Sequence, residues 1–107
     1  DAAEAVLLAL HAALEPARRH FGYRTAGEVI DFVRAMMSAG ADEAAALDQA
    51  VFAKVLPKLR GEDDPVLRGA LEAAQKVAAK HGMTRSEQKL TLMRQRLADT
   101  GVTRFWS

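Results

Sequence analysis

The sequence predicts an all-α fold, a single compact bundle of about five helices. Apolar residues recur at steps of three and four along most of the chain, and residues typical of helix starts and ends divide it into five segments. No segment has the alternating, β-branched pattern of a strand. The 107 residues are 50% hydrophobic and 27% charged, which is typical of one globular domain. We therefore expect residues 1–107 to form a single helical domain.

The first helix is predicted over residues 3–18, where the apolar spacing defines one helix face. The residues of this face are Val6, Leu7, Leu10, Ala13, Leu14 and Ala17. Pro16 is expected to loosen the end of the helix, because proline lacks a backbone N–H. Residues 20–24 then break the helical period.

The second and third helices follow capping signals. Thr25 with Glu28 predicts a capping box, and Gly40 ends the second helix. Its buried stripe is predicted to be Val29, Ile30, Val33, Met36 and Met37. Asp42 is expected to cap a third helix that runs into residues 55–56, before Pro57 forces a kink or a stop. The apolar residues of this helix are Leu47, Ala50 and Val51.

The fourth and fifth helices come after a polar turn predicted at residues 60–64. Asp64 as cap with Pro65 at the first helical position starts the fourth helix, and Gly82 ends it. Its inward residues are predicted to be Val66, Leu67, Ala70, Leu71, Ala74, Val77 and Ala78. Thr84 with Glu87 predicts a second capping box. The fifth helix is expected to end before Gly101 and to bury Leu90, Met93 and Leu97.

Composition restricts the function. The formal charge is +1, which does not by itself indicate nucleic-acid or membrane binding. The chain has no cysteine, no apolar run near the ~20 residues of a membrane span, and no signal-peptide pattern. We therefore expect a cytoplasmic protein without a membrane partner. The first residue is Asp1 and not Met, which suggests a piece of a longer chain.

No complete active site can be assembled from the sequence. His11, His20 and His81 lie far apart and lack the spacing of a metal motif, so no metal site is expected. The glycines form neither GxxxxGK[ST] nor GxGxxG, and no nucleophile motif is present. The acidic residues 62–64 are better explained by helix capping than by binding of a divalent cation.

Four cations and one aromatic pair remain as candidates. Lys54, Lys58 and Arg60 either neutralise a helix end or contact a phosphate or an acidic partner. Arg24 stands just before a predicted helix start, where an anion can meet both its charge and free backbone donors. Trp106, next to Phe105, is either an exposed anchor for a partner or part of the closure of the bundle, and we expect closure.

An ordered set of short stretches carries a family resemblance. They are residues 7–11 (LLALH), 21–24 (FGYR), 28–33 (EVIDFV), 46–48 (ALD), 54–61 (KVLPKLRG) and 89–90 (KL), followed by Met93, Leu97, Gly101, Phe105 and Trp106. This set resembles the region that follows the nucleotide-binding core in McrB-like AAA+ proteins. Those proteins are the GTPase or ATPase motor subunits of modification-dependent restriction systems and related defence systems.

The resemblance implies an accessory helical, or lid, domain at the C-terminal end of a motor subunit. It implies that Arg24 matches the sensor 2 arginine, which contacts nucleotide phosphates. The parent would bind GTP or ATP with Mg²⁺, whereas this chain alone would bind no cofactor. The implied partners are the N-terminal AAA+ core of the same chain and the neighbouring subunits of a homo-oligomeric ring. A nuclease subunit and DNA would be reached through the parent.

An alternative is a stand-alone helical module that binds a protein, or that binds DNA through a helix-turn-helix pair. Gly82 between two helices, with Lys80, Arg85 and Lys89 close by, supports DNA contact. A self-contained enzyme ranks last, because no nucleophile, metal cluster or pair of catalytic acids is available.

Overall fold

The computed structural model describes residues 2–106 and confirms the predicted all-α bundle. The five α-helices of this range are α1 (Ala2–Leu14), α2 (Tyr23–Ser38), α3 (Glu43–Lys54), α4 (Pro65–Lys80) and α5 (Thr84–Thr100). Two 3₁₀ turns, η1 (Glu15–Ala17) and η2 (Leu56–Lys58), follow α1 and α3. Two short strands, β1 (Arg60–Glu62) and β2 (Val102–Arg104), complete the fold.

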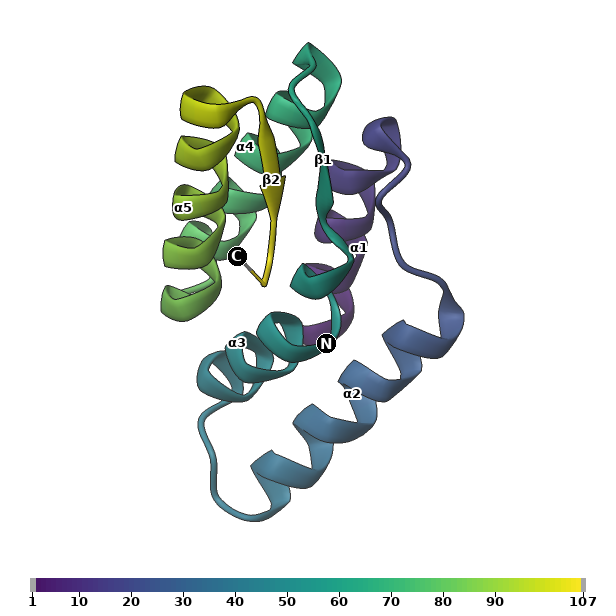
Figure 1. The fold of residues 1–107 in the computed structure, drawn as a ribbon. Helices are drawn as coiled ribbons and strands as arrows, with labels where there is room; N and C mark the ends of the chain where they lie inside the picture. Colours follow the sequence, from purple (N-terminus) through teal and green to yellow (C-terminus); the bar gives the residue numbers. More distant parts are fainter. Residues whose placement is uncertain (1, 107) are drawn as a thin grey trace.

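The helices form an elongated body with α2 at its edge. Helices α4 and α5 lie side by side, α1 packs against α4, and α3 packs against α5 (Figure 1). Helix α2 packs mainly against α3, and it extends away from the α4–α5 pair (Figure 1). The principal extents of 42 × 23 × 22 Å reflect this projection.

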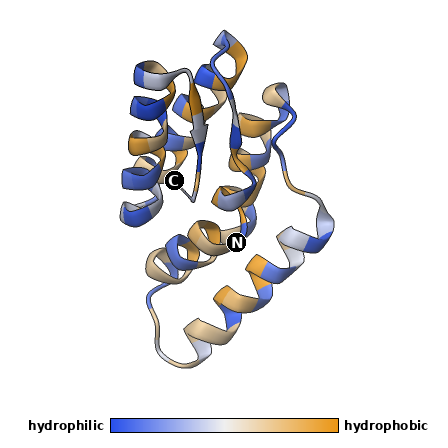
Figure 2. Cartoon of the chain, viewed as in Figure 1, coloured by the Kyte–Doolittle hydropathy of each residue, from blue (hydrophilic) through white to orange (hydrophobic). Residues whose placement is uncertain are grey.

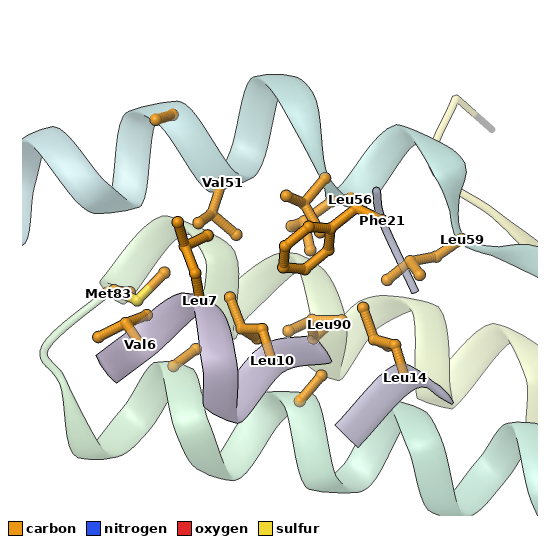
Figure 3. Packing of buried hydrophobic residues seen from close by; sticks show 14 of the residues in the cluster. Val6, Leu7, Leu10, Leu14, Phe21, Val51, Leu56, Leu59, Met83 and Leu90 are labelled. Carbon is orange, nitrogen blue, oxygen red and sulfur yellow. The ribbon is translucent and has the colours of Figure 1, made fainter. Parts of the chain in front are cut away.

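One hydrophobic core joins the elements. Figure 3 shows side chains of α1 lying between α3 and the α4–α5 pair, with Leu10 and Leu14 near its centre. Leu56, the first residue of the prolyl turn η2, and Leu59, directly after that turn, are fully buried in the same cluster, as is Leu90 of α5. Figure 2 shows hydrophobic residues on the facing sides of the helices and mostly hydrophilic residues on the outer side of α5.

Two of the predicted helix caps are confirmed. The backbone N–H of Ala45 donates to Asp42 at the start of α3 at 3.2 Å, and that of Leu67 donates to Asp64 at the start of α4 at 2.8 Å. Pro65 is the first residue of α4, where its missing N–H costs no hydrogen bond.

Both predicted capping boxes are wrong. Helix α2 begins at Tyr23, so Thr25 already lies inside its first turn, and Gly22 is the N-cap. Helix α5 begins at Thr84 itself, after the N-cap residue Met83. The first turn of α5 is capped instead by the side chain of Asp48 in α3.

The ends of the first and third helices match the effects expected of proline. The α-helical part of the first helix stops at Leu14 and continues as the 3₁₀ turn that contains Pro16. Arg18 then adopts a left-handed conformation with φ of 57°. Helix α3 stops at Lys54, ahead of Pro57. Two residues predicted to face inward are exposed, since Met37 is 43% and Val66 is 49% accessible.

A small antiparallel sheet replaces the polar turn predicted at residues 60–64. Strand β1 pairs with β2, and Gly61 lies opposite Thr103. Arg19 secures the segment after α1 to this sheet, because its Nε donates to the carbonyl oxygen of Arg60 at 2.8 Å. Gly61 has φ of 158°, and a Cβ there would lie 2.9 Å from Leu67 Cδ2. A larger residue at this position would therefore require the Leu67 side chain or the strand to shift.

Candidate functional site

Arg24 is the second residue of α2, and its side chain is exposed. The sequence placed it just before the helix, because the helix start was expected at Thr25. The first turns of α3, α4 and α5 are each capped by an aspartate, whereas the N-cap of α2 is Gly22, which has no side chain. No N-cap side chain therefore neutralises the positive end of α2, and Arg24 lies in the first turn at that end.

An apolar hollow of about 590 Å³ adjoins this helix start. It lies between α1 and the start of α2, and Leu7, Phe21 and Ile30 contribute to its wall. Leu8 and Tyr23 border it with 72% and 98% of their surfaces accessible. An apolar surface and a cationic helix start thus occur side by side.

Two histidines that are far apart in sequence also meet at this hollow. The ring centroids of His11 and His20 are 4.8 Å apart, and the His11 ring lies edge-on to Phe21 at 5.8 Å. The sequence spacing did not predict this contact between the two histidines. The contact forms because η1 folds the chain back on itself. Across residues 2–106, no three His, Asp or Glu side chains gather as they would around a metal ion.

The cations Lys54, Lys58 and Arg60 lie on three different elements, α3, η2 and β1. Lys54 Nζ is 3.2 Å from Glu28 Oε2, an ion pair that links α3 to α2. Lys58 and Arg60 are exposed, and the carbonyl oxygen of Arg60 accepts the hydrogen bond from Arg19. Lys54 therefore has a structural partner, while the side chains of the other two cations face solvent.

The three carboxylates of residues 62–64 have separate positions. Asp64 caps α4, as the capping interpretation expected. Asp63 forms an ion pair with Arg68, with Oδ1 2.9 Å from Nε. Glu62 belongs to β1.

A second candidate site combines aromatic rings and cations from α3, α5 and the residues after β2. We call Phe52, Arg85, Lys89, Phe105 and Trp106 the aromatic–cation face. The Phe105 ring lies 5.0 Å from that of Phe52 and 4.7 Å from that of Trp106. Arg85 Cζ lies 4.4 Å from the centre of the Phe52 ring, and Lys89 Nζ lies 4.6 Å from that of Phe105.

The predicted closure of the bundle by residues 105–106 is right for one residue and wrong for the other. Phe105 is 6% accessible and covers the core, whereas Trp106 is 78% accessible. The exposed indole and the two cations project from one region. Sequence reasoning missed the face as a unit, because its members are separated by up to half of the chain.

Helices α4 and α5, which carry Lys80, Arg85 and Lys89, run side by side in opposite directions (Figures 1 and 3). A helix-turn-helix motif instead joins its helices at about 90–120°. Gly82 turns the chain between them with φ of 70°.

Comparison with known proteins gives one result. A model of a domain of unknown function, DUF8727, matches residues 1–102. The chain belongs to the DUF8727 family. No curated protein matches the DUF8727 chain, and no solved structure does so. Within residues 2–106, this DUF8727 domain has no helix that is both long enough and apolar enough to cross a membrane.

Proposed function

We propose that this chain is the accessory helical, or lid, domain of a McrB-like AAA+ GTPase or ATPase motor subunit that works in the cytoplasm. The observation that carries the proposal is the position of Arg24, an exposed arginine in the first turn of a helix whose N-cap is glycine. The order of the resembling stretches along the sequence also supports it.

The chemistry of this position suits a phosphate group. First-turn N–H groups and the helix dipole favour negative charge, and a guanidinium adds charge-assisted hydrogen bonds. A nucleoside triphosphate with Mg²⁺, held by the parent's core, would supply the phosphoryl group that is transferred to water. Arg24 would bind and orient its phosphates, since this chain has no phosphate-binding loop of its own.

The packing of α2 suggests how such a contact would be transmitted. Helix α2 packs mainly on α3, and the Glu28–Lys54 ion pair links the two helices at 3.2 Å. A pull on the start of α2 would therefore pass to α3 and through it to the core. In a homo-oligomeric ring, such a movement would change the contacts with the AAA+ core and with neighbouring subunits, and a nuclease partner and DNA would respond through the parent.

The test uses the intact parent protein. We expect Arg24→Ala to lower GTP or ATP hydrolysis roughly 10²-fold or more, because one preorganised phosphate donor is lost. Arg24→Lys should recover part of the rate, since it keeps the charge but not the planar fork. Lys76→Ala is the control, because the Lys76 side chain is 77% accessible and its ion pair is with Glu72, one turn away on the same helix. Equal hydrolysis by the wild type and Arg24→Ala would reject the proposal.

A further inference from the structure

The aromatic–cation face has a feature that the proposed lid role does not use. Its rings form a continuous series from Phe52 through Phe105 to Trp106, with centroid separations of 5.0 and 4.7 Å. The series ends in an indole that is 78% accessible. Tryptophan is enriched at binding interfaces, where its ring supplies a large apolar contact area.

We propose that the aromatic–cation face binds single-stranded nucleic acid. A base stacks on Trp106, and the adjoining phosphates contact Arg85 and Lys89. The proposal goes beyond the lid role and does not depend on Arg24, which lies on a different helix.

The indole of Trp106 is positioned for stacking. The Phe105 ring meets it nearly at right angles, with an interplanar angle of 81°, so this contact is edge-on and not a face-to-face stack. Phe105 itself is anchored in the core at 6% accessibility. The indole is thus held from one direction by a buried neighbour, and its accessible surface is available to a planar base.

The two cations are positioned by the same rings. Arg85 lies over Phe52 and Lys89 over Phe105, at 4.4 and 4.6 Å. Residues 85 and 89 are one helical turn apart, so their charges lie on one side of α5. Ring contacts limit the conformations of these long side chains before any ligand binds, which reduces the entropy lost on binding a phosphate.

The start of α5 is not itself the phosphate site. Asp48 already accepts the backbone N–H groups of Arg85 and Ser86, each at 2.8 Å. A phosphate approaching α5 would therefore meet side-chain cations and not free backbone donors. This arrangement favours contacts along an extended backbone over one anion held at a helix end.

The shape of the face selects a strand over other ligands. The hollow between Phe52, Lys89 and Leu92 measures about 230 Å³, below the roughly 300–1,000 Å³ of small-molecule pockets. Bases inside a duplex are already stacked on one another, so an unpaired base is the favoured stacking partner for the indole. An acidic peptide would match the two cations, but its carboxylates give the indole no aromatic ring to stack on. A single strand uses both parts of the face.

The experiment uses the 107-residue chain and exploits its one tryptophan. Single-stranded (dT)12 is titrated at low salt, and both Trp106 fluorescence and the anisotropy of a labelled oligonucleotide are followed. We expect quenching with saturation. The affinity should fall with salt at a log–log slope near −1.4, as expected for two phosphate contacts on a single strand.

Variants separate stacking from charge. Trp106→Ala should weaken (dT)12 binding about tenfold or more, and Trp106→Phe should restore part of the affinity because it keeps a ring. Arg85→Gln and Lys89→Gln should each flatten the salt slope by about 0.7, whereas Lys76→Ala should bind as the wild type does. Circular dichroism checks that each variant is folded.

The competing partner classes give different results. Quenching by oligoglutamate as strong as by (dT)12 would overturn the proposal in favour of an acidic protein partner. Equal affinity for a blunt duplex, or no binding of (dT)12 at low salt, would also overturn it. The effect of Arg24→Ala on hydrolysis in the parent does not change the expected binding of (dT)12. Failure of the lid proposal and failure of the nucleic-acid proposal can therefore be distinguished.

Discussion

Asp48 of α3 caps the start of α5 by accepting the backbone N–H of Ser86 at 2.8 Å, although the two residues are 38 positions apart. The second carboxylate oxygen accepts the N–H of Arg85, also at 2.8 Å. Ser86 Oγ in turn donates to the backbone carbonyl of Asp48 at 3.3 Å. Asp48 is 8% accessible and Ser86 is fully buried, so this junction fixes the angle at which α3 meets α5 in a water-poor environment.

Replacement of Asp48 by Ala should therefore destabilise the protein by about 2–4 kcal/mol, because a helix cap is lost and buried donors are left without an acceptor. Asp48→Asn keeps one acceptor oxygen and should cost less. Asp42→Ala removes an exposed local cap and serves as the comparison, with an expected loss of about 1 kcal/mol. Urea denaturation followed by circular dichroism measures all three. A loss for Asp48→Ala no larger than that for Asp42→Ala would show that the junction adds nothing beyond ordinary capping.

Gly61→Ala should cost about 1–3 kcal/mol, because the new Cβ would lie 2.9 Å from Leu67 Cδ2 and φ is 158°. The matched control is Gly69→Ala in α4, where nothing lies within 4 Å of the added Cβ. That change should stabilise the protein by about 0.5–1 kcal/mol through helix propensity. Thermal unfolding should thus shift in opposite directions for the two variants, and shifts of the same sign would contradict the close approach of β1 to α4.

Leu10 and Leu8 test which face of α1 packs into the core. Leu10 is 1% accessible and Leu8 is 72% accessible. Leu10→Ala should lower the free energy of unfolding by about 2–5 kcal/mol, since it removes buried methyl groups and leaves a cavity. Leu8→Ala should change it by less than about 0.5 kcal/mol. Chemical denaturation compares the two variants. Similar losses of stability would mean that the face of α1 that carries Leu8 also packs into the core.

Arg24→Ala is expected to leave the free energy of unfolding within about 0.5 kcal/mol of the wild type, because the side chain is exposed. This expectation matters for the hydrolysis test in the parent protein. If the variant unfolds at a clearly lower denaturant concentration, a reduced rate would reflect lost structure. Equilibrium unfolding of the isolated chain should accordingly precede any kinetic measurement.

The helical parts of the fold were predictable because their signals are local. Asp42 and Asp64 cap helices that start within three residues of them, and proline and glycine act on the adjacent backbone. The cap of α5 was not predictable in this way, since Thr84 and Glu87 offered a plausible local alternative to a carboxylate 38 residues away. The one signal in the sequence was the position of a charged residue, Asp48, between Leu47 and Ala50 on the predicted apolar side of this helix.

The strands and the candidate sites depended on the tertiary fold. Three residues in β1 and three in β2 are too few to show an alternating pattern, and their pairing requires the intervening helices to return the chain. Arg24 was recognisable from its place near a helix start. The aromatic–cation face was not, because α3, α5 and the residues after β2 meet only when the bundle has formed.

The pairing of β1 with β2 has a consequence for cooperativity. The two strands lie before α4 and after α5 in the sequence, and their pairing joins the two ends of this segment. The backbone N–H of Asp63 adds a further link, since it donates to the carbonyl oxygen of Gly101 at 2.9 Å. Residues 60–104 thus form a unit whose two ends are joined, while α2 packs mainly on one neighbouring helix (Figure 1). Helix α2 should therefore exchange its amide hydrogens through local opening, and α4 and α5 should exchange theirs only when the whole domain unfolds.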